Sequence, residues 1–154
     1  MTISGFPSRS NPAGHTGRRE GIALGATLAT ATWLWVAIID AVAGHPFHTF
    51  HVLGGVLVFT LVHFALNIIL GSVLVSVVHD AAHTPSAMFG LIFCGILFEC
   101  GMAMFTNILA AATLGPMAWL ALFGGSLLSA TIAISILRRG HPLGEYLARA
   151  EVEN

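Results

Sequence analysis

Four stretches of the chain are almost entirely apolar, and each has the length that crosses a lipid bilayer. A helix of about 20 apolar residues spans the roughly 30 Å hydrocarbon core. The stretches cover, approximately, residues 21–43, 51–78, 87–113 and 116–138. The pattern therefore predicts an all-α polytopic membrane protein. Short connections between the spans favour an antiparallel bundle of four transmembrane helices.

Composition and charge sharpen this picture. Charged residues make up 8% of the chain, whereas a soluble domain carries about 25%. Lysine is absent, and alanine and glycine are abundant. That usage is typical of GC-rich bacterial genomes, so we expect the protein in the bacterial cytoplasmic (inner) membrane.

The basic residues indicate how the spans are oriented. All of them are arginines, and they lie before the first span or at and beyond the end of the fourth: Arg9, Arg18, Arg19, Arg138, Arg139 and Arg149. By the positive-inside rule, both termini are expected to be cytoplasmic. The predicted parts are a flexible cytoplasmic tail, the transmembrane domain and a cytoplasmic tail with a short interfacial helix, at residues 1–20, 21–138 and 139–154.

The first span also has features of a signal peptide. Arg18-Arg19 precedes the apolar run, and the small residues Ala41-Val42-Ala43 end it. The run is longer than the 7–15 residues that a signal peptide usually contains. Cleavage of this span therefore remains an open alternative.

Polar and small residues follow one face of the second span. Thr60, His63, Asn67 and Gly71 recur at helical spacing in an otherwise apolar helix. Lipid cannot satisfy their donors and acceptors, so this face is expected to contact protein or trapped water.

Glu99 is the one acidic residue deep inside a predicted span, and His63 lies at a similar depth. Because the second and third spans are consecutive, we expect the two side chains to touch. His63, Asn67 and Glu99 are thus predicted to form an intramembrane polar centre. Either it fixes helix register by hydrogen bonding, or it serves as a proton relay or ligand site.

A histidine-rich connector is the candidate metal site. His45, His48 and His51 recur every three residues, and Asp40 precedes them. Imidazole is a common ligand for Zn, Cu and Ni. The alternative is that these residues only populate the membrane–water boundary. Haem b would require two axial histidines from facing helices, so His63 would need its counterpart from a second chain.

Small residues mark expected helix-packing seams, because they let helix backbones approach closely. The seam residues are Gly71, Gly95, Gly125 and Ser129. Cys94 and Cys100 lie too far apart around one helix to bridge, and we expect buried free thiols.

Short connections leave no room for a catalytic domain between the spans, so an enzyme is not the favoured class. We expect a non-catalytic accessory or assembly subunit of a larger membrane complex or homo-oligomer, with the lipid bilayer around it and no nucleic-acid partner. The first alternative is a small proton or transition-metal ion transporter or channel that uses Glu99 and His63. The second is a haem-binding redox subunit.

Overall fold

The structure, a computed structural model, describes residues 13–81 and 87–140. It contains four long helices: α1 (Ala13–Val42), α3 (Val56–Ala81), α4 (Ala87–Leu109) and α5 (Gly124–Gly140). The short segments are α2 (His48–Val52) and two π-helical turns, η1 (Ala110–Leu114) and η2 (Trp119–Phe123). No strand occurs among these residues.

Four helical segments are long and apolar enough to cross a membrane. They are Gly17–Val42, Val56–Asp80, Phe89–Leu109 and Trp119–Gly140. The prediction of an all-helical chain with four candidate spans is confirmed.

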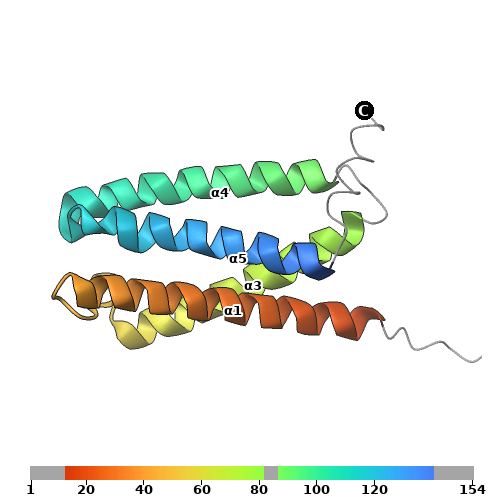
Figure 1. Cartoon of the computed structure of the whole chain (residues 1–154), viewed down its shortest axis with the longest axis horizontal. Coiled ribbons are helices and arrows are strands. Elements are labelled where there is room, and N and C mark those ends of the chain that lie inside the picture. Colours follow the sequence, from red (N-terminus) through yellow and green to blue (C-terminus); the bar gives the residue numbers. More distant parts are fainter. Residues whose placement is uncertain (1–12, 82–86, 141–154) are drawn as a thin grey trace, which may run out of the picture.

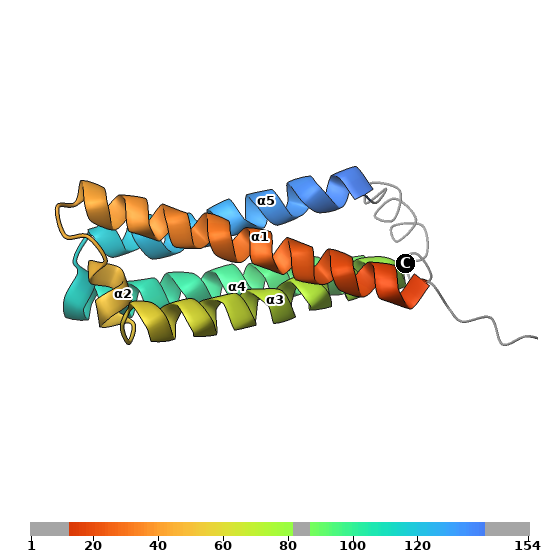
Figure 2. The ribbon, with the colours of Figure 1, turned by 90° about the horizontal axis from the view of Figure 1, so that it is seen from below.

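The long helices lie side by side along the longest axis of the molecule (Figure 1). The connections from α1 to α3 and from α4 to α5 lie at one end, while α3 ends and α4 begins at the other. α1 packs against both α3 and α5 (Figure 2). A buried apolar cluster joins these three helices, and its members are Leu24, Leu28, Val75, Val78, Ala133 and Leu137.

The closest approach in the bundle is made by glycines of α1 and α3. A Cβ added to Gly25 would lie 2.3 Å from the Asn67 carbonyl oxygen, and one added to Gly21 would lie 2.7 Å from the Ser72 Cα. Gly71 faces the same crossing from α3. No larger residue fits these positions unless the two helices separate.

The polar stripe of the second span faces α1, whereas the sequence indicated only that it contacts protein or trapped water. The Trp33 indole nitrogen donates to Thr60 Oγ1 over 2.9 Å, and His63 contacts the Ala29 carbonyl. The stripe therefore packs against protein, and its donors and acceptors find partners there.

The second span is not one helix from residue 51. Gly54 and Gly55 have φ angles of 105° and 92°, which side chains disfavour and glycine tolerates. This break places His51 in α2, while His63 lies in α3. The apolar pattern missed the break because the residues around it are also apolar.

The first helix begins before the expected transmembrane domain. α1 begins at Ala13, inside the segment expected to be a flexible tail. An apolar window marks the membrane span, and a helix can continue beyond it with polar residues. The predicted interfacial helix after Gly140 lies outside the described residues.

Candidate functional site

His63 is held against α1 at the centre of the polar stripe. Its Nε2 lies 3.2 Å from the Ala29 carbonyl oxygen, which can only accept, so Nε2–H donates. Its ring stacks on Phe59 at a centroid distance of 5.1 Å. Asn67 donates to the His63 carbonyl over 2.9 Å. Axial ligation of a haem through Nε2 would require the bond to Ala29 to break.

Glu99 has a different partner, on α5. Ser126 Oγ donates to Glu99 Oε2 over 2.8 Å, and the same hydroxyl lies 3.0 Å from the Phe123 carbonyl oxygen. A hydroxyl has one hydrogen, so it can donate to only one of these acceptors at a time. If Glu99 is protonated, it can donate to Ser126 Oγ, and the hydroxyl can then donate to Phe123.

The predicted contact between His63 and Glu99 is therefore not formed. No hydrogen bond or ion pair joins these two described side chains, because α3 turns His63 toward α1 and α4 turns Glu99 toward α5. Asn67 stays with His63. The residues of the expected polar centre thus lie in two separate places. His63 and Asn67 lie where α3 packs against α1, and Glu99 lies where α4 packs against α5.

A third polar contact ties α1 to α5. Thr32 Oγ1 and Ser129 Oγ form a short hydrogen bond, and Thr32 also bonds the Leu28 carbonyl. One turn earlier in α5, a Cβ on Gly125 would lie 3.2 Å from Thr32 and 3.3 Å from Trp35. Polar contacts thus join three pairs of long helices: α3 with α1, α1 with α5, and α5 with α4.

The rest of the described chain covers little of the surface of α4. A Cβ on Gly95 would meet nothing within 4 Å, so no other described helix packs closely against this expected seam residue. Cys94 and Cys100 are exposed, and the expectation that they are buried is wrong. Thr106, in contrast, is fully buried, and its hydroxyl has no hydrogen-bond partner.

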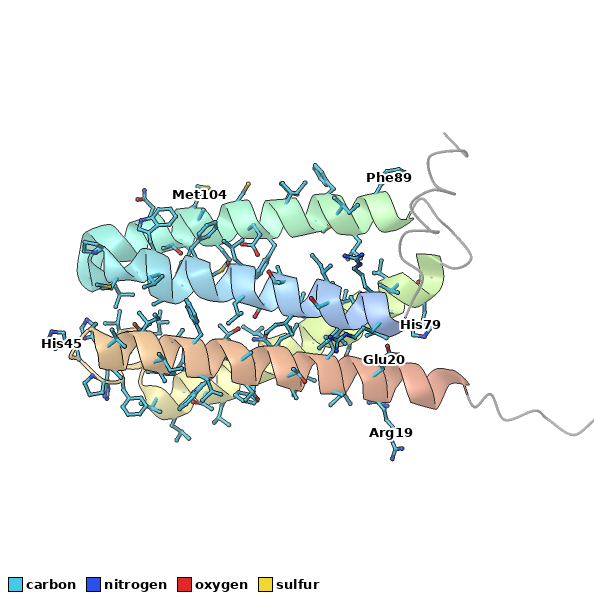
Figure 3. The ribbon with its side chains drawn as sticks, in the orientation of Figure 1. Arg19, Glu20, His45, His79, Phe89 and Met104 are labelled. Atoms are coloured by element: carbon cyan, nitrogen blue, oxygen red, sulfur yellow. The ribbon has the colours of Figure 1, made fainter. Side chains whose placement is uncertain are left out.

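The histidine-rich connector lies at the end of the bundle opposite Arg19, Glu20 and His79 (Figure 3). Asp40 is buried there and accepts from both the amide and the hydroxyl of Thr49, over 2.8 Å and 2.6 Å. Within residues 13–81 and 87–140, no three His, Cys, Asp or Glu side chains converge in a way that could hold a metal ion. The two hydrogen bonds from Thr49 to Asp40 join α2 to α1.

Sequence reasoning missed the partner residues Thr32, Thr49 and Ser126. Each is a single hydroxyl within or beside an apolar run, and such residues commonly bond their own helix. The sequence signal for Ser126 was its position next to the Gly124–Gly125 pair, but only the helix arrangement assigns its partner.

Comparisons with known proteins identify no relative. No protein-family model matches the chain, and searches of curated proteins and of solved structures give no match either. Any functional assignment must therefore come from the side chains.

Proposed function

We propose that this chain is a non-catalytic accessory or assembly subunit that binds other membrane helices through α4. The complex would be a homo-oligomer or a larger assembly in the bacterial inner membrane. In this proposal the four spans form an antiparallel bundle with both termini cytoplasmic.

The observation that carries the proposal is the environment of Glu99. Its side chain is half-buried, and Ser126 bonds one of its two oxygens. No described residue donates a hydrogen bond to the other oxygen, Oε1. Lipid tails offer no donor, and an ionisable group near the bilayer centre costs about 2.5–3.5 kcal/mol on insertion scales. A helix from another chain can supply the missing partner.

The surroundings of Glu99 leave room for such a helix. Gly95 lies four residues earlier, which places it on the same face of α4 one turn away. Nothing lies within 4 Å of a Cβ at this position. In the apolar stretch of α4, 6% of the residues are buried, against 17% in that of α3 and 33% in those of α1 and of η2 with α5. A second backbone can therefore approach α4 closely beside the carboxyl group.

This geometry supports an accessory role over the transporter alternative. A proton or ion path through both Glu99 and His63 needs the two groups to communicate. Each of them instead bonds a different helix. The accessory role requires only the open face of α4.

The proposal is tested by cross-linking in native membranes. A photoreactive amino acid at position 95 should form an adduct with a second copy or another membrane protein, whereas one at Ile134, an exposed position of α5, should not. Glu99→Leu should abolish the adduct at position 95, and Glu99→Gln should retain it because an amide keeps the hydrogen bonding. Equal adducts at both positions, or none at position 95, would contradict the proposal.

A further inference from the structure

A small cavity opens where the connection from α1 to α2 meets the start of η2. Its volume is about 120 Å³, and its walls include Asp40, His45, His48, Thr49, Met117 and Ala118. Segments more than 65 residues apart in the sequence thus place two imidazoles and a thioether around one space. His51, the third histidine of the connector, is not among the cavity-lining residues.

The two imidazoles are free to bind a ligand. The centroids of the His45 and His48 rings are 6.2 Å apart. Both side chains are exposed, and no described residue forms a hydrogen bond with their ring nitrogens. Two metal–nitrogen bonds of about 2 Å each, together with the two ring radii, span roughly this separation. That sum holds for nitrogens on opposite sides of the ion, so a three-coordinate ion requires the exposed His45 and His48 side chains to rotate and bring their rings closer together.

Asp40 organises this pair of histidines. Its carboxylate bonds the Thr49 amide and hydroxyl, which fixes the residue next to His48. Its carbonyl oxygen accepts the His45 amide over 3.1 Å, and the His48 amide bonds the His45 carbonyl over the same distance. The backbone that carries both imidazoles is thus ordered before any ligand binds, which lowers the entropy cost of binding.

We propose that His45, His48 and Met117 form a binding site for Cu(I). A thioether is a soft ligand that selects Cu(I), and imidazole suits copper as well. The Asp40 carboxylate, the hard ligand in the cavity, is buried and is held by a hydrogen bond from Thr49 to each of its oxygens, which orients it toward Thr49. A three-coordinate, mixed nitrogen and sulfur site therefore favours Cu(I) over Zn²⁺, which takes four ligands in structural sites. This inference does not depend on the role proposed for α4.

The experiment is a Cu(I) competition titration of the purified full-length chain in detergent, under reducing conditions. A chromogenic Cu(I) chelator reports the copper that the protein withholds. Cys94→Ala and Cys100→Ala are introduced together in the parent protein, because exposed thiols also bind copper. One Cu(I) per chain is expected. His45→Asn or His48→Asn should weaken binding at least about tenfold, the lower bound for loss of a supporting group at a metal site.

Two matched variants decide whether the ion occupies this cavity. His51→Asn changes a neighbouring histidine outside the cavity and should leave Cu(I) affinity unchanged. Met117→Leu keeps the side-chain size, and it should weaken Cu(I) binding without changing Zn²⁺ binding. An equal loss in His51→Asn, an unaffected Met117→Leu, or no retained Cu(I) would each overturn the proposal. The variants must elute from size-exclusion chromatography as the parent does.

Discussion

Gly25 and Gly71 meet where α1 crosses α3, and a Cβ added to Gly71 would lie 2.5 Å from the Gly25 amide nitrogen. The two backbones are therefore in contact with no side chain between them. Such small-residue crossings give transmembrane helices their van der Waals contact in the absence of a hydrophobic driving force. The contact fixes α1 and α3 as the closest pair in the bundle.

Alanine substitution should have opposite effects at this crossing and at a glycine of α4 that no other helix covers. Glycine to alanine in a helix normally stabilises by about 0.5–1 kcal/mol. Gly101→Ala, which meets nothing within 4 Å, should show that gain. Gly71→Ala should instead destabilise by about 1–3 kcal/mol through overpacking. Unfolding in mixed detergent micelles measures both, and equal shifts would refute the close crossing.

Ser126 and Glu99 should be energetically coupled, whereas His63 and Glu99 should not. Removing both members of a bonded pair costs less than the sum of the single losses, and coupling in membrane proteins averages about 0.6 kcal/mol. A double-mutant cycle of Ser126→Ala with Glu99→Leu should give a coupling of that size. The corresponding cycle with His63→Leu should be additive. Coupling in the second cycle alone would favour the contact predicted from the sequence.

Asp40 should control the order of α2. Asp40→Ala leaves the buried Thr49 amide without its acceptor, at a cost of about 1–3 kcal/mol. Hydrogen exchange of the Thr49 amide should accelerate, while that of amides in the middle of α3 should not change. Asp80→Ala, at an exposed acidic residue near the end of α3, serves as the control. Unchanged exchange at Thr49 would mean that Asp40 does not hold this turn.

The proposed orientation can be tested with reporter fusions. Fusions after Gly44 and Gly115 should report the outer side, and fusions after Ala81 and Asn154 should report the cytoplasm, because the arginines flank the first and last spans. An external C-terminus would contradict the orientation.

The apolar pattern predicted the spans and the inward face of α3 because both follow from short-range periodicity. The residues Thr60, His63 and Asn67 repeat at helical spacing, so one face of the helix was evident without coordinates. The partner of that face was not evident. His63 and Glu99 share a depth, yet depth leaves the rotation of each helix undetermined. The rotation is set by contacts such as Gly25 with Gly71, which join distant segments.

The pattern of apolar residues also does not predict where the chain departs from regular α-helix. Gly54 and Gly55 break the second apolar stretch because both have positive φ angles. Other glycines, such as Gly71, continue a helix, so the presence of glycine alone does not predict a break. The π-helical turns η1 and η2 consist of ordinary apolar residues, and nothing in their composition distinguishes them from the α-helices beside them.

The π-helical turn η2 has a consequence for which chain lengths this fold tolerates. A π turn holds one residue more than the α-helical turn that it replaces. Deleting one residue from Trp119–Phe123 should therefore restore an α-helical turn while Ala118 and Ser126 keep their inward directions. Deleting Thr131 instead should rotate the two halves of α5 by about 100° relative to each other and separate Ser126 from Leu137 around the helix. A deletion scan scored by the yield of folded protein should find η2 the most permissive segment of the fourth span.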